Sequence, residues 1–175
     1  MKVDATLMHR LFYPQVPAIF CAQHGGRVSA MPVVSYAWVS GRPPLVAVGC
    51  NPASFTFKLA VKARAFSLCL VDRRYVEAVE RLATESGKGA KDKIADAGLG
   101  HRKAPTVDAP IINEAVATLE CELDSKRKLG DHVLLIGLVK ASYASENFSD
   151  FWDFERYRPI LYTGWKKGLS TYPTH

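Results

Sequence analysis

Several features that would assign this 175-residue chain to a common class are missing. No apolar run approaches the roughly 20 residues that a membrane helix needs, and the start lacks the charged-then-apolar layout of a secretory signal. The four cysteines form no CxxC pair, and the histidines show no HxxxH or HExxH spacing, so no metal site is predicted. The sequence therefore predicts a cytoplasmic protein whose cysteines are buried thiols.

The usual nucleotide-binding loops are also missing. Residues 86–91 lack the third glycine of a GxGxxG fingerprint and the Lys-Ser/Thr ending of a P-loop. The net charge of +6 suits an anionic ligand, but the basic residues are dispersed, with clusters only at 88–93 and 126–128. Neither cluster is interleaved with aromatic residues as a surface that stacks single strands would be, so neither nucleic acid nor membrane is predicted as a partner.

What the sequence does contain is ordinary globular composition. Hydrophobic residues make up 48% and charged residues 23%, which argues against disorder and provides enough apolar area for a core without disulfides. No repeat or low-complexity linker divides the chain. Residues 1–175 are therefore predicted to form one domain.

Short strand patterns dominate the chain. The apolar stretches 18–24 and 28–39, joined at Gly25-Gly26, predict a β-hairpin. Further strands are predicted at residues 45–50, 65–71, 115–124, 133–139 and 160–162. Apolar and polar residues alternate over residues 115–124, which predicts a solvent-exposed strand face that carries Thr118, Glu120, Glu122 and Asp124. Residues 125–131 are predicted to form a charged hairpin connection.

Helical patterns are fewer. Asn51 as N-cap and Pro52 at the first position predict a helix to about Ala63. A second helix is predicted after Asp72. Residues 88–110 are predicted to form a polar excursion from the core, with a short helix at residues 91–97. Because most connections are hairpins and closure removes strand edges, the pattern predicts a mainly β antiparallel barrel with a few helices, closed by the strand 160–162.

The strongest local signal for a ligand is the start of the first helix. Two hydroxyls, Ser54 and Thr56, and the ammonium of Lys58 lie in its first turns, where free backbone N–H groups and the helix dipole attract anions. The same residues are also explained by simple capping, with Lys58 as a solvated surface residue.

Two weaker candidates follow. The strand at residues 29–36 contains Pro32 and small residues that would leave backbone groups free to meet a planar ligand, although such a proline also marks an edge or a bulge. His132, after Gly130-Asp131, would either face a pocket or hydrogen-bond its own loop.

In this order, the segments resemble the flavin reductase-like family of FMN-binding split barrels, which includes flavin:NAD(P)H reductases, flavoredoxins and ferric reductases. The likeness runs from about Tyr13 to Thr163 and is carried by residues 26–35, 43–49, 54–58, 86–87, 92–93, 119–121 and 130–137. The resemblance implies an antiparallel Greek-key split β-barrel that binds FMN as a homodimer.

The resemblance also implies roles for single residues. Ser54, Thr56 and Lys58 would hold the FMN phosphate, the strand 31–35 would follow the isoalloxazine ring, and His132 would position the nicotinamide without transferring a proton. The implied cofactor-binding residues are Met31, Pro32, Val33, Val34, Ser35, Asn51, Ser54, Phe55, Thr56, Lys58, Ser86 and Lys88.

The implied activity is electron transfer from NAD(P)H through FMN to an acceptor: free flavin, ferric chelate, oxygen, or a partner oxygenase or redox protein. Three alternatives remain open. They are an FMN electron carrier that nicotinamide does not reduce directly, a barrel for another flat ligand such as haem or a pyridoxal-type phosphate, and an oligonucleotide-binding barrel.

Overall fold

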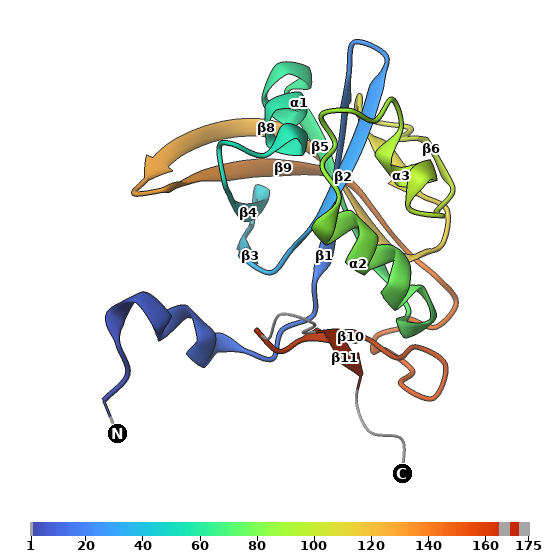
Figure 1. The fold of residues 1–175 in the computed structure, drawn as a ribbon. Helices are drawn as coiled ribbons and strands as arrows, with labels where there is room; N and C mark the ends of the chain where they lie inside the picture. The colour runs from blue at the N-terminus through green and yellow to red at the C-terminus, as the bar shows by residue number, and fades with distance from the viewer. Residues whose placement is uncertain (1, 165–168, 172–175) are drawn as a thin grey trace.

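A computed structural model describes residues 2–164 and 169–171 (Figure 1). Seven strands form one antiparallel sheet in the order β2-β1-β5-β8-β9-β4-β3. Their bounds are β1 (Ala18–His24), β2 (Arg27–Val33), β3 (Tyr36–Gly41), β4 (Pro44–Cys50), β5 (Ala65–Val71), β8 (Ala115–Leu129) and β9 (His132–Ala144). The prediction of a mainly β, antiparallel chain is confirmed, but the sheet is not closed, because β2 and β3 are its two edges.

The stretch predicted as one strand at residues 28–39 is two strands. β2 ends at Val33 and β3 begins at Tyr36, and the backbone N–H of Gly49 donates to the carbonyl of Ser35 at 2.7 Å. Two linking residues span only about 10 Å between their flanking Cα atoms. The sheet therefore curls until its two edges come close together at Val34-Ser35.

The first helix, α1 (Phe55–Ala63), begins later than predicted. Asn51 does not cap it, because its Oδ1 accepts the N–H of Ala53 at 2.8 Å and closes a turn before the helix. Ser54 is the N-cap, and its Oγ accepts the N–H of Phe57 at 3.5 Å. The predicted end near Ala63 is confirmed, and α1 packs on β1 and β5.

The polar excursion lies outside the main sheet, as predicted. It follows the short turn η2 (Arg73–Tyr75) and α2 (Val76–Thr84), and contains α3 (Lys93–Asp96) and two paired strands, β6 (His101–Lys103) and β7 (Pro110–Ile112). Both α2 and α3 pack against β2, and β7 packs against β5. Figure 1 shows these elements together on one side of the sheet.

The prediction of a solvent-exposed face on β8 is wrong at two positions. Thr118 is buried and Glu120 is 0% exposed, because the excursion covers this part of the strand. The Oε2 atom of Glu120 accepts both the backbone N–H and the hydroxyl of Thr106, which fastens the covering loop to the strand.

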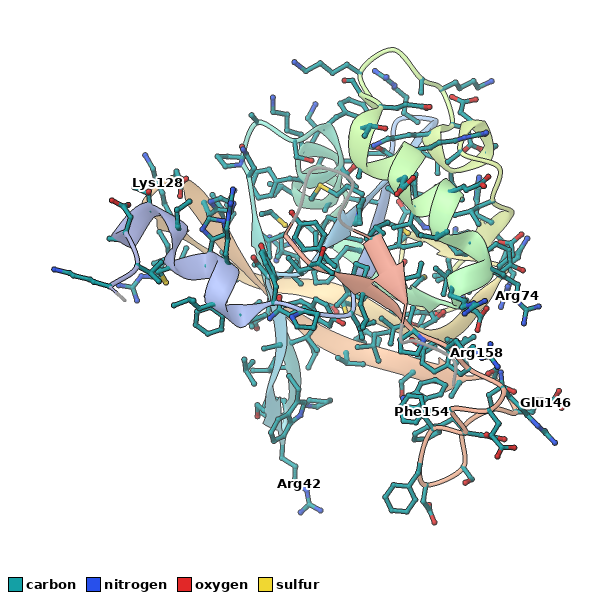
Figure 2. All side chains as sticks on the ribbon, turned by 60° about the horizontal axis from the view of Figure 1, so that its bottom comes forward. Arg42, Arg74, Lys128, Glu146, Phe154 and Arg158 are labelled. Atoms are coloured by element: carbon teal, nitrogen blue, oxygen red, sulfur yellow. The ribbon has the colours of Figure 1, made fainter. Side chains whose placement is uncertain are left out.

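The charged connection predicted at residues 125–131 is mostly strand. β8 continues to Leu129 and β9 starts at His132, so only Gly130 and Asp131 form the turn, with Gly130 at φ +58°. The resulting hairpin projects from the body (Figure 1), and Lys128 marks its outer end in Figure 2.

The strand predicted to close the barrel does not join the main sheet. β10 (Ile160–Tyr162) pairs with β11 (Leu169–Thr171) in a separate sheet, and Tyr162 pairs with Gln15. The rings of Tyr162 and Tyr13 lie 4.7 Å apart, so the end of the chain binds the segment before β1 instead of a barrel edge.

A helical segment, η1 (Ala5–Phe12), was not predicted. Asp4 caps it, but none of its residues is buried, and Phe12 is 66% exposed. No helix in the described part of the chain is long and apolar enough to cross a membrane.

The prediction of four buried cysteines is confirmed. Cys50 and Cys121 lie in the core inside the curled sheet, and Cys21 and Cys69 lie between the sheet and the excursion. Burial raises the pKa of Cys50 and of Cys121 to about 12, so both stay protonated at neutral pH.

Candidate functional site

A cleft of about 350 Å³ lies where the start of α1 faces the end of α2 and the loop after it. We call it the helix-start cleft. The predicted site residues that line it are Met31, Asn51, Ser54, Phe55, Thr56, Ser86 and Lys88. The fold thus brings together residues from β2, α1 and the excursion that the sequence separates by up to 57 positions, the span from Met31 to Lys88.

The backbone at the start of α1 offers unused donors to this cleft. Phe55 and Thr56 are the first two helical residues, and their N–H groups donate to no acceptor in the described part of the chain. The hydroxyl of Ser54 contacts the Met31 sulfur at 2.9 Å. A helix of nine residues adds the positive end of its dipole, so this edge of the cleft suits an anion.

A buried pair of hydroxyls lies behind the helix start. Thr56 is 2% exposed and its Oγ1 is 2.9 Å from the Oγ of Ser29, which is fully buried. Thr56 lines the cleft, whereas Ser29 is not among the lining residues. Ser29 therefore fixes the Thr56 hydroxyl from behind and leaves its other hydrogen-bonding capacity for the cleft.

The structure adds a residue that the sequence prediction missed, Lys93. It lines the cleft, is only 5% exposed, and its Nζ donates to the carbonyl of Leu82 at 2.7 Å. Burial lowers its pKa, an effect that the charge of Glu85 opposes. An ammonium has three donors, so two remain for a ligand.

Lys58, by contrast, is exposed and does not line this cleft among the described residues. Its role in phosphate binding remains a prediction. The sequence holds only a faint signal for Lys93. This lysine is the first residue of α3, directly after the N-cap Asp92. Because helical side chains tilt toward the N-terminus of their helix, the Lys93 side chain is directed back past the helix start.

The loop at residues 86–90 is held in place by Arg27. Its guanidinium donates to the carbonyls of Gly87 at 2.9 Å and Ala90 at 2.8 Å, and also to that of Lys88. The same group lies over the ring of Phe55, 4.2 Å from its centroid. Arg27 therefore ties the outer wall of the cleft to the start of α1.

A second cleft, of about 360 Å³, lies between η1 and β3, and we call it the η1 cleft. Val34 and Ser35 line it, so the predicted ring-binding strand divides between the two clefts: Met31 reaches the first and residues 34–35 the second.

Besides Lys58, three predicted residues line neither cleft among the described residues. Pro32 is paired with Ile19 in the sheet, and Val33 belongs to the core. His132 is exposed at the end of the β8–β9 hairpin, where its Nδ1 lies 2.9 Å from the Asp131 carboxylate and holds the pKa of that carboxyl below its usual range.

Comparisons with known proteins give a consistent result. The family described as "Flavin reductase like domain" matches residues 8–162. A protein of Aeropyrum pernix is 33% identical over 164 residues, which cover 93% of this chain but only 62% of that protein. A flavin reductase of Pseudomonas putida is 31% identical over 129 residues, 73% of this chain and 72% of that protein.

Among solved structures, an FMN-binding protein of Thermus thermophilus with bound 1-cyclohex-2-enone has a TM-score of 0.82 and 30% identity, covering 98% of this chain and 94% of that one. Flavoredoxin of Methanosarcina acetivorans has a TM-score of 0.86 at 19% identity, covering 100% of this chain and 92% of that one. The second likeness supports the fold alone.

Proposed function

Because the chain belongs to the flavin reductase-like family, we propose that it binds FMN and uses it to transfer electrons from NAD(P)H to an acceptor. The observation that carries the proposal is the convergence of three groups on the helix-start cleft: the free N–H groups of α1, the Thr56 hydroxyl and the buried ammonium of Lys93. The names of two relatives near 30% identity, a flavin reductase and an FMN-binding protein, support it.

The residues present fit a phosphate. A buried lysine is costly to charge unless an anion or another acceptor partners it, and the Leu82 carbonyl satisfies only one of its donors. A phosphate dianion would accept from Lys93, from the Thr56 hydroxyl and from the N–H groups of Phe55 and Thr56. Glu85 is the one acidic residue that lines the cleft in the described part of the chain.

The chain would then orient the rest of the cofactor along β2. From the helix-start cleft, residues 31–35 lead to the η1 cleft, and we expect a ring bound along them largely through backbone groups. When bound, the isoalloxazine supplies the redox chemistry, accepting a hydride from the nicotinamide and passing two electrons to the acceptor. The chain's own part is to bind, orient and shield.

A homodimer belongs to the same proposal. Large apolar side chains stand exposed on separate segments: Phe12 on η1, Trp38 (74%) on β3, and Phe151 (81%) and Phe154 on the loop after β9. Figure 2 labels Phe154 on that loop. A second copy of the chain would cover such side chains, and it is the partner we propose.

The test is an anaerobic titration of the FMN-loaded protein with NADH and, separately, NADPH, followed by the visible absorption of the flavin. We expect one nicotinamide to bleach the flavin with a stoichiometry of about one per bound FMN. Bleaching by dithionite but by neither nicotinamide would overturn the reductase role and favour an electron carrier. Failure of the purified protein to retain or bind FMN would overturn the cofactor itself.

A further inference from the structure

The short helix α3 carries the buried Lys93 at its first position, so the start of this helix determines where the ammonium lies. α3 has only four residues. Isolated helices shorter than about 12 residues are marginal in water, so contacts with the rest of the fold must hold this one. The question is which side chains fix its start.

The backbone that leads into α3 is anchored on β2. The N–H of Val28 donates to the carbonyl of Lys91 at 3.0 Å, and Val28 forms a parallel bridge with Asp92. These contacts fix the position of the backbone at Asp92. They do not fix the direction in which the helix leaves it, because that depends on the first N–H groups of the helix.

The Asp92 carboxylate is used from two sides. Its Oδ1 accepts the N–H groups of Ile94 at 3.1 Å and Ala95 at 3.0 Å, which caps the helix. Its Oδ2 lies 2.7 Å from the Nε2 of His101, which belongs to β6. The cap residue of α3 is therefore held from outside the helix by a histidine nine positions later.

In this pair the histidine is the donor. Burial alone would raise the pKa of the Asp92 carboxyl, but the hydrogen bonds from His101 and from the backbone of α3 hold that pKa below its usual range. An ionised carboxylate only accepts hydrogen bonds. The proton therefore lies on Nε2 of His101, and the bond is charge-assisted.

His101 is itself fixed by contacts that do not involve α3. It pairs with Ile112 of β7, and the N–H of the preceding Gly100 donates to both carboxylate oxygens of Glu114, at 3.0 and 3.1 Å. β7 packs against β5 of the main sheet, and Ile112 is only 2% exposed. The imidazole thus connects the start of α3 to a second support, separate from β2.

We infer that His101 is a positioning residue for the helix-start cleft: through Asp92 it fixes the start of α3 and thereby holds the Lys93 ammonium in the wall of the cleft. His101 does not line the cleft among the described residues, so it acts only through Asp92 and Lys93. That the held ammonium serves a phosphate rests on the proposed function; that His101 holds it does not.

The FMN-free protein gives the first test. Lysine labelled with ¹³C at Cε is incorporated, and the pKa of each ammonium is followed by NMR. Burial lowers the pKa of Lys93, so in His101→Phe, which keeps a ring but removes the donor, this pKa should rise toward 10.5. His101→Ala, which adds no bulk, should give the same rise, and His101→Gln, which restores a donor, should reverse it. The exposed Lys58 is the reference in the same spectra.

The second test is fluorescence titration with FMN and with riboflavin. His101→Phe should weaken FMN about 3- to 10-fold, on the scale of one lost hydrogen bond, and leave riboflavin unchanged. In the Lys93→Met background the same change should have no further effect, because the group that His101 positions is gone. Arg102→Met is the control, since it removes a bond of the same strand to Asn113, at 3.0 Å, and should leave FMN affinity unchanged.

An unchanged Lys93 pKa in both His101→Phe and His101→Ala would overturn the inference. So would an equal loss of FMN affinity with and without Lys93, or an effect of Arg102→Met as large as that of His101→Phe. If the chain binds no FMN at all, the proposed function fails, and the titration of Lys93 in the free protein still decides whether His101 holds this lysine.

Discussion

At the scale of single residues, the hydroxyl pair of Ser29 and Thr56 separates ligand binding from stability. Both hydroxyls are buried and each is the partner of the other at 2.9 Å, but only Thr56 lines the helix-start cleft. Removing either one leaves a buried hydroxyl unpaired and should cost about 1–3 kcal/mol of stability. Only the loss of Thr56 also removes a hydroxyl from the cleft in which we propose that the phosphate binds.

We therefore predict that Thr56→Ala lowers FMN affinity about 10- to 100-fold, since a hydrogen bond to a charged group contributes about 1.5–3 kcal/mol. Ser29→Ala, the matched control, should cost similar stability and change FMN affinity far less. Fluorescence titration with FMN and with riboflavin measures both effects. Equal weakening of riboflavin and FMN by Thr56→Ala would show a disturbed fold instead of a lost phosphate ligand.

Lys93 gives a prediction with a definite pH dependence. Burial lowers its pKa below 10.5, so as the pH rises toward 10.5 the free protein loses this charge before an exposed lysine would. In our proposal the phosphate binds the charged form of Lys93, so FMN affinity should fall relative to riboflavin affinity as the pH rises through that window. Lys93→Met should remove this dependence and lower FMN affinity about tenfold or more near neutral pH; Lys58→Met should keep the dependence.

The stability of the FMN-free protein should change with pH in the opposite direction to FMN affinity. Between the lowered pKa and 10.5 the unfolded chain binds more protons than the folded one, so the free energy of unfolding rises with pH there. Urea denaturation of the wild type and of Lys93→Met at several pH values checks this. A pH-independent difference between the two proteins would contradict a buried, titrating Lys93.

Lys58 and Lys93 also show which part of this cleft sequence alone could not predict. The helix start could be predicted, because hydroxyls after a strand and a proline are a local signal. The burial of Lys93 is not local: it arises because α3 packs against β2, where its cap residue Asp92 pairs with Val28, 64 residues earlier in the sequence. The sequence therefore predicted the helix start as the edge that suits an anion, but not the buried cation that faces it.

At the scale of elements, prediction succeeded where a segment has its own pattern. β4 and β5 are short, branched and apolar, and their predicted bounds agree with the structure within one residue. η1 was missed because none of its side chains is buried, so no apolar stripe faces a core. The two strands of the excursion were missed because three residues each are too few for a visible period.

The loop at residues 86–90 offers a matched pair of glycines for an element-scale prediction. A Cβ on Gly87 would lie 2.6 Å from the Ser29 hydroxyl and 3.0 Å from the Phe55 ring, whereas a Cβ on Gly89 would meet nothing within 4 Å. Gly87→Ala should push the loop off the start of α1, with a cost of about 1–3 kcal/mol and a loss of FMN affinity of about tenfold or more. Gly89→Ala should leave both within about 0.5 kcal/mol; equal effects of the two variants, measured by thermal denaturation and FMN titration, would contradict this close packing.

At the scale of the whole molecule, the prediction of an antiparallel β architecture held because hairpin turns and short strands are encoded locally, but closure is a property of the assembled sheet. The two-residue link between β2 and β3 curls the sheet, yet its edges do not pair. The curl leaves the β8–β9 hairpin extended beyond the body, as Lys128 shows in Figure 2. His132 lies at the end of that hairpin and lines neither cleft among the described residues, whereas Leu134, two residues further along β9, lines the η1 cleft.

This position leads to a prediction that joins His132 to the homodimer: the histidine acts on the partner's flavin site. His132→Ala should raise the KM for NAD(P)H several-fold and leave FMN affinity nearly unchanged, because alignment of the nicotinamide is lost while the phosphate site is intact. Light scattering should give a dimer; a monomer that retains FMN at micromolar concentration would contradict it.

Mixed dimers decide which chain's site His132 serves. In a dimer of one His132→Ala chain and one Thr56→Ala chain, isolated through two different tags and loaded with limiting FMN, the flavin should occupy the chain with intact Thr56. If the histidine acts across the interface, that site receives His132 from the other chain and shows the wild-type KM. If it acts within its own chain, the same site lacks the histidine and keeps the raised KM of the His132→Ala homodimer. A wild-type KM in the His132→Ala homodimer itself, with a loss of stability of more than about 1 kcal/mol, would mean that His132 only anchors the hairpin turn.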